Sequence, residues 1–273
     1  MARDDITSVE PGLFRQFREQ FHLLFAPHRH SALLGAIIAL FLVRPFTGDT
    51  GAGPPLFSLL IVLLLLMALY NIDVEHLVGD REVLLAQRRR RNAITWTLAA
   101  AAIVERWISI FAPEHSFHMG GSALILVLFA YITWSQLRAV LKQKEVTSEV
   151  ISMSISTYLL LGLTCGMLYN VIYDVHPASF IFSAGGPNSQ QQAIPILMYF
   201  SLTTLSTIGF GDITPVTLQA RYIAVAEGIT GQFYLAILVA RLVSMQMTQP
   251  AGSQPAITSA DSKKQSSHGR EGK

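Results

Sequence analysis

Long apolar runs separated by short polar segments fill most of the chain, and each run is expected to form a membrane-spanning helix. A helix needs about 20 mostly apolar residues to cross the hydrocarbon core of a bilayer. Six runs come close to this length or exceed it: Ser31–Phe46, Pro55–Ile72, Ala93–Ala112, Ser122–Leu141, Val150–Tyr173 and Val216–Met247. A further apolar segment, Ile194–Phe210, is too short to cross the membrane twice. The pattern therefore predicts an all-α membrane protein with six transmembrane helices and one re-entrant segment between the last two.

The composition supports a protein whose outer surface faces lipid. Hydrophobic residues make up 51% of the 273 residues and charged residues 14%, against about 25% charged in an ordinary soluble chain. The apolar content excludes a mainly disordered chain, and the single cysteine, Cys165, excludes a disulfide scaffold. A formal net charge of +2 is too small to suggest nucleic-acid binding. The sequence assembles no paired carboxylates and no Ser–His–Asp arrangement, so neither an enzyme nor a cofactor is expected.

Lysines and arginines gather on one set of loops, which indicates how the spans are oriented. They precede the first span, join spans two and three, join spans four and five, and follow span six: Arg3, Arg15, Arg18, Arg29, Arg81, Arg88, Arg89, Arg90, Arg91, Arg138, Lys142, Lys144, Lys263, Lys264, Arg270 and Lys273. Because basic loops are enriched on the cytoplasmic side, we expect both termini to be cytoplasmic, in a plasma (cell inner) membrane. The Arg88–Arg91 run is either a site for anionic lipid or a determinant of this topology, and the second interpretation is preferred.

The segment Tyr199–Pro215 carries the chemistry. A short helix can begin at Pro195, because proline is favoured in a first helical turn, and end at Ser206. Directly after it come Thr207, Ile208, Gly209, Phe210, Gly211 and Asp212. Glycine at every second position lets the backbone adopt conformations that other residues avoid, so successive carbonyls can point to one side. At membrane depth such carbonyls are costly unless they face something polar, and a dehydrated cation would satisfy them.

This stretch resembles the selectivity filter of the potassium channel family. The family pattern Thr-x-Gly-(Tyr/Phe)-Gly-Asp is present at Thr207–Asp212. The Thr-rich end of a pore helix precedes it: Thr203, Thr204, Leu205 and Ser206. The resemblance covers about residues 146–248 and implies K⁺ sites at the carbonyls of Thr207, Ile208, Gly209 and Phe210. It also implies a homotetramer, because each chain supplies one filter strand and four are needed, and an inner-helix hinge at Gly231 or Gly228.

Two residues depart from the family pattern. Phe210 stands where tyrosine is commonest, so the carbonyl is kept but the phenolic hydroxyl that often braces the filter is lost. Thr203 stands where some bacterial members hold a carboxylate behind the filter. Because the Phe210 carbonyl is unchanged, we expect a potassium-selective channel that conducts K⁺ passively. The alternative is a non-selective monovalent cation channel on the same fold.

Two acidic residues near this segment each have two interpretations. Asp212 forms an acidic ring at the outer mouth or hydrogen-bonds the pore helix, and the two roles are compatible. Glu227 lies within the sixth span, where a carboxylate is expensive and usually has a partner. It lines the cavity and concentrates cations, or it bonds Thr203, Thr204 or Gln232 near the filter base, and the second interpretation is preferred.

The first four spans match a voltage-sensing domain in number but not in charge. The fourth span has no basic residue over Ser122–Trp134, and Arg138 and Lys142 come only at its cytoplasmic end. Because sensing requires charge within the membrane field, the sequence predicts weak or absent voltage dependence of opening. What opens the channel is not indicated by any motif.

The chain is thus expected to divide into four units. Residues 1–30 form a cytoplasmic N-terminus, in which Leu13–Phe25 has its apolar side chains on one helical face, typical of an interfacial helix or of a packed cytoplasmic one. Residues 31–145 form a four-helix peripheral domain, and residues 146–248 form a pore domain. Residues 249–273, rich in Ser, Gln and Gly, are expected to be a disordered cytoplasmic tail.

Overall fold

The structure, a computed structural model, describes residues 29–47, 53–75, 100, 118–183, 185–187 and 190–248. Its helices are α2 (Arg29–Thr47), α3 (Gly53–Glu75), α5 (His118–Lys142), α6 (Ser148–Val175), the 3₁₀ helix η2 (Pro177–Ser179), α7 (Gln190–Leu205) and α8 (Leu218–Thr248). Two short strands, β1 (Phe180–Phe182) and β2 (Ile213–Pro215), complete the described elements.

Five of the six predicted spans coincide with α2, α3, α5, α6 and α8 to within a few residues. Among the described residues, three stretches are long and apolar enough to cross a membrane: Gly120–Lys142, Ser148–Val175 and Leu218–Met245. The apolar parts of α2 and α3 are shorter. The predicted third span, the Leu13–Phe25 helix, the Arg88–Arg91 run and the tail lie outside the described residues. The chain is thus a mainly helical membrane protein, and the total of six spans stays a prediction.

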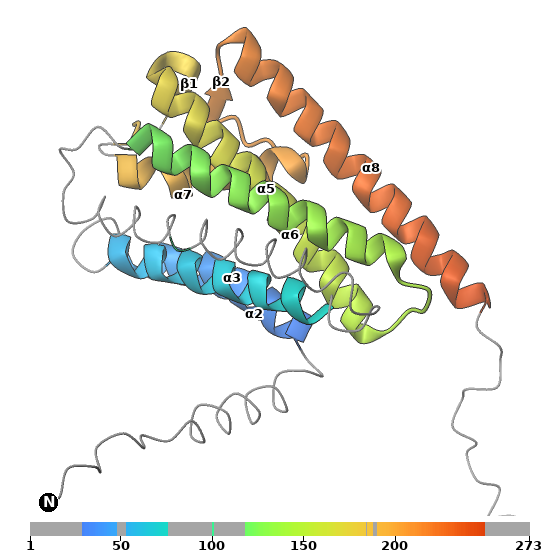
Figure 1. Ribbon diagram of the computed structural model, residues 1–273. Helices are drawn as coiled ribbons and strands as arrows, with labels where there is room; N and C mark the ends of the chain where they lie inside the picture. Colours follow the sequence, from blue (N-terminus) through green and yellow to red (C-terminus); the bar gives the residue numbers. More distant parts are fainter. Residues whose placement is uncertain are drawn as a thin grey trace, which may run out of the picture.

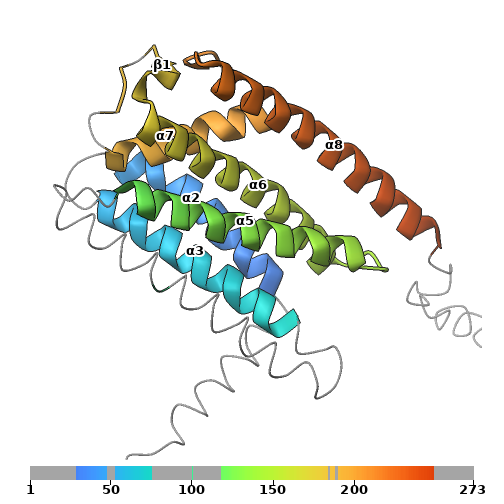
Figure 2. The same cartoon turned by 45° about the horizontal axis from the view of Figure 1, so that its top comes forward.

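The helices form a layered bundle. In both Figure 1 and Figure 2, α2 and α3 pack on one side of α5 and α6, and α8 runs along the opposite edge. Buried side chains of α2, α3, α5 and α6 form the main core, among them Leu33, Ile37, Leu64, Phe129, Ile132, Leu160 and Leu163. Ile194 and Met198 of α7 join the same core. The short helix is therefore held by the peripheral helices as well as by α6.

A carboxylate at the start of α6 ties this helix to α2. Thr147 caps α6 by accepting a hydrogen bond from the backbone N–H of Val150 at 3.3 Å, and an acidic residue in the first turn suits the helix dipole. That residue, Glu149, also accepts bonds from the His30 N–H at 3.2 Å and the Ser31 hydroxyl at 2.9 Å. The Glu149 carboxylate thus satisfies donors at the start of α2 while its charge suits the start of α6.

The α6–α7 contact is close because glycine faces it. A Cβ on Gly166 would lie 2.8 Å from the Cα of Met198, and a Cβ on Gly162 would lie 2.7 Å from the Cδ2 of Leu202. These distances leave no room for a larger residue. Glycines spaced four apart let two helix backbones approach, as in membrane helix pairs generally.

The segment between α6 and α8 starts and finishes at the same end of these helices. β1, which follows α6, pairs antiparallel with β2, which precedes α8, with Ile181 opposite Thr214. Between the strands, α7 runs for 16 residues, or about 24 Å, before the chain turns back. The segment thus leaves and returns to one end of the bundle, and its re-entry into a membrane stays a prediction.

The predicted start of the short helix at Pro195 is wrong. The helix begins at Gln190, so the proline lies inside it. Proline lacks one backbone donor, and so close to a helix start this removes a single hydrogen bond without ending the helix.

Candidate functional site

The backbone after α7 alternates between two conformations. The φ angle is positive at Thr207 (59°), Gly209 (54°) and Gly211 (79°), that is, at every second residue. Glycine adopts this left-handed region readily, whereas threonine does so only at a cost in strain. In an ordinary strand successive carbonyls point to opposite sides, and a left-handed residue at every second position removes that alternation. The carbonyls of this stretch can therefore face one side together.

The amide groups of the same stretch are bound to the end of α7. The N–H groups of Ile208 and Gly209 both donate to the Thr203 carbonyl, at 2.8 and 3.1 Å, and the Thr207 N–H donates to the Thr204 carbonyl at 3.0 Å. Within the described part of the chain, no backbone hydrogen bond goes to the carbonyls of residues 207–210. Residues 207–211 are also exposed in the single chain. A row of open carbonyl oxygens results.

The hydroxyls at the end of α7 turn back onto the helix. Those of Thr203 and Thr204 donate to the Phe200 carbonyl, at 2.9 and 2.8 Å, and that of Ser206 donates to the Leu202 carbonyl at 2.6 Å. Serine and threonine hydroxyls in helices commonly return in this way to a carbonyl three or four residues earlier. The Thr-rich end predicted from the sequence is therefore present as a compact helix terminus.

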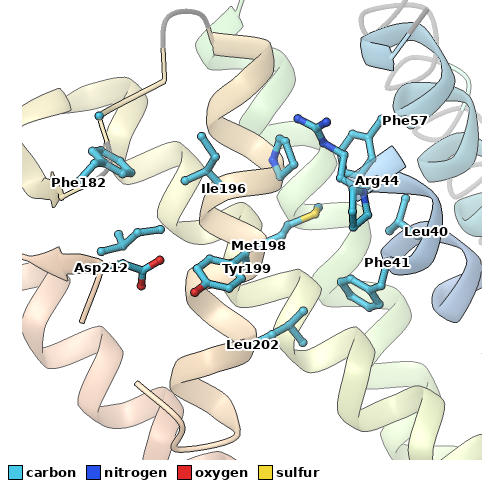
Figure 3. Close-up of a pocket in the computed structure, with 14 residues that line it drawn as sticks. Leu40, Phe41, Arg44, Phe57, Phe182, Ile196, Met198, Tyr199, Leu202 and Asp212 are labelled. Carbon is cyan, nitrogen blue, oxygen red and sulfur yellow. The ribbon is translucent and has the colours of Figure 1, made fainter. Parts of the chain in front are cut away.

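Tyr199 holds the far end of the stretch. Figure 3 shows its hydroxyl facing the Asp212 carboxylate, to which it is hydrogen-bonded. Its ring lies parallel to that of Phe210, with centroids 6.4 Å apart and planes 4° apart. Of the two roles considered for Asp212, its hydrogen bond to Tyr199 of α7 corresponds to the second, a bond to the short helix. Tyr199 is not among the site residues predicted from the sequence, although its place in the short helix before the motif is a usable signal.

A cavity of about 560 Å³ lies beside this pair. Figure 3 shows its walls, which come from α2, α3, α7 and the region of the two strands and include Phe41, Arg44, Phe57 and Phe182. The Arg44 guanidinium lies 5.7 Å from the centroid of the Phe57 ring. The peripheral helices therefore reach the residues that hold the glycine-rich stretch.

Glu227 is buried among side chains and does not line an open cavity in the chain. Only 4% of its surface is exposed. One carboxyl oxygen accepts a hydrogen bond from the Tyr169 hydroxyl of α6 at 2.5 Å, and the other contacts the Ser201 hydroxyl of α7. The predicted partners, Thr203, Thr204 and Gln232, are thus replaced by two others. Ser201 and Tyr169 lie on separate helices, so spacing along α8 could not reveal them.

Gly231 packs against the end of α7. A Cβ there would collide with the Leu205 carbonyl oxygen, whereas a Cβ on Gly228 would lie an ordinary 3.6 Å from the Thr204 carbonyl oxygen. The Tyr158 hydroxyl of α6 donates to the same Leu205 carbonyl at 3.1 Å. Gly231 therefore has a packing role of its own, and a hinge at either glycine stays a prediction.

Comparison with known proteins places the site in a family. A family model described as ion channel matches residues 153–247, which contain α7, the glycine-rich stretch and nearly all of α8. No solved structure matches the chain.

Three curated relatives each match about a quarter to a third of the chain. Potassium channel protein kcv of Paramecium bursaria Chlorella virus 1 is 36% identical over 73 residues, which are 26% of this chain and 77% of the viral protein. Two pore potassium channel c of Oryza sativa subsp. japonica is 34% identical over 32% of this chain and 17% of its own length. Protein LctB of Bacillus caldotenax is 34% identical over 32% of this chain and 64% of its own length. The described backbone and the match to most of the viral channel agree, and the chain belongs to the potassium channel family.

Proposed function

We propose that the protein is a potassium-selective channel that conducts K⁺ passively through a homotetrameric pore. The observation that carries this proposal is the left-handed backbone at residues 207, 209 and 211, with no backbone hydrogen bond to the carbonyls of residues 207–210 in the described chain. Such carbonyls replace the hydration shell of an ion that enters a filter. The rice and viral relatives are potassium channels by name.

The ion sites of the proposed filter are the carbonyls of Thr207, Ile208, Gly209 and Phe210, with the Thr207 hydroxyl as the innermost ligand. Backbone amides of the same stretch are bound to Thr203 and Thr204. The oxygens are therefore oriented by the end of α7 and need little rearrangement when an ion arrives. The four-helix peripheral domain surrounds this pore, both termini are cytoplasmic, and the pore segment enters the plasma membrane from outside.

Four chains are required because one chain supplies one wall of the filter. The surface of α8 supports this assembly. Only 17% of the most apolar stretch of α8 is buried within the chain, whereas 56% of the corresponding stretch of α6 is buried. Large apolar side chains remain exposed along the helix, including Leu218, Tyr222, Val225, Ile229 and Phe233. In a tetramer, neighbouring chains cover part of this surface and the rest faces lipid or the pore.

Ion flux into liposomes that contain the purified protein tests the proposal. We expect K⁺ uptake down a gradient that barium blocks and that excludes Na⁺. Equal passage of K⁺ and Na⁺ would favour a non-selective cation channel, in which Phe210 without its hydroxyl leaves the filter loose. Protein-free liposomes give the background. Absence of barium-sensitive flux in several lipid compositions and at several pH values would contradict conduction altogether.

A further inference from the structure

The carboxyl group of Glu227 lies inside the bundle, and its contacts in the described chain are with neutral groups. Tyr169 and Ser201, which bond its two oxygens, are both fully buried. The Cys165 thiol of α6 faces the same carboxyl group. An ionised carboxylate at such a place, without a cation beside it, carries a large desolvation cost.

The hydrogen bonds of the Ser201 hydroxyl indicate whether Glu227 is protonated. Its single hydroxyl hydrogen has two oxygen neighbours, the Gly162 carbonyl at 2.6 Å and a carboxyl oxygen of Glu227. If Glu227 were ionised, both neighbours could only accept, and one close oxygen pair would have no hydrogen between them. If Glu227 is protonated, its O–H donates to Ser201, and the Ser201 hydroxyl donates to Gly162. Every oxygen then has a partner.

We infer that Glu227 is a neutral carboxylic acid that positions the pore helix. Hydrogen bonds run from Tyr169 to Glu227, from Glu227 to Ser201 and from Ser201 to the Gly162 carbonyl. These three bonds fasten α7 to α8 at one point and to α6 at another, and they join α8 to α6 at a third. Because α7 also supplies the Thr203 carbonyl that binds the amides of Ile208 and Gly209, its position sets that of the proposed filter. The effect on ion selectivity rests on the proposed channel function.

Infrared difference spectroscopy tests the protonation state directly and does not require conduction. We expect the spectrum of the wild type minus that of Glu227→Gln to contain a carboxylic-acid carbonyl band at neutral pH. Tyr169→Phe removes the hydrogen bond to that carbonyl and shifts the band to higher frequency. Tyr234→Phe is the matched control, because the Tyr234 hydroxyl donates to the Ser154 carbonyl at 2.7 Å instead. A carboxylate band in place of the acid band would overturn the inference.

Flux measurements test the positioning role. Glu227→Leu leaves the buried hydroxyls of Tyr169 and Ser201 without their partner, and we expect the K⁺/Na⁺ permeability ratio to fall roughly tenfold. Glu227→Gln has the shape of the neutral acid, with an N–H to donate to Ser201 and a carbonyl to accept from Tyr169, so it should restore the ratio. A Gln variant as impaired as the Leu variant would show that the charge matters and would contradict the inference. If the wild type conducts nothing, the channel proposal fails while the infrared result still stands.

Discussion

At the scale of single residues, Gly209 owes its identity to backbone conformation and not to space. A Cβ there would meet no atom within 4 Å, but the φ of 54° is unfavourable for other residues, by about 1–2 kcal/mol. We therefore expect Gly209→Ala to lower K⁺ flux by about tenfold or more. Gly120→Ala is the control, because a Cβ on Gly120 of α5 also meets nothing and its φ is not positive. Unchanged flux in Gly209→Ala would show that these carbonyls are not the ion path.

At the scale of elements, Gly231 and Gly228 look alike in the sequence but differ in how closely they pack against α7. Gly231→Ala forces a Cβ onto the Leu205 carbonyl oxygen, and overpacking of this kind costs about 1–3 kcal/mol. We expect a clear loss of thermal stability and of flux. Gly228→Ala, at an ordinary contact distance, should change both little. If the two variants behave alike, α8 does not approach α7 as described.

The same helices show what the sequence could and could not predict. The unusual backbone of residues 207–211 could be predicted because its signal is local: glycines at alternate positions after a short apolar helix. The bounds of α5, α6 and α8 could be predicted because apolar runs of that length are typical of membrane-spanning helices. The partners of Glu227 could not be predicted, because Ser201 and Tyr169 lie 26 and 58 residues away on other helices. Such contacts depend on which helix faces pack together, and the pattern of hydrophobic residues along the chain does not determine this.

The charge distribution of α5 carries a prediction about gating. Arg138 stacks on Trp134, with its guanidinium carbon 4.8 Å from the ring centroid, near the end of the helix that leads to Lys142. A charge at the membrane edge moves through little of the field, so opening should be nearly independent of voltage. We expect a shallow conductance–voltage relation in planar bilayers, unaltered in slope by Arg138→Gln. A steep relation that flattens in the variant would contradict this interpretation.

At the scale of the whole molecule, the filter proposed above would make each chain dependent on its neighbours. When wild-type and Gly209→Ala chains are co-expressed in equal amounts, random assembly leaves about one sixteenth of tetramers free of the variant. If one altered strand is as damaging as four, flux per chain should fall to about that fraction plus the residual flux measured for Gly209→Ala alone. Native mass spectrometry of the purified complex, with one chain carrying a mass tag, gives the subunit count independently. A residual flux of about one quarter would indicate that two chains form the unit, and about one half would mean that each chain conducts alone, which a filter built from four strands does not permit.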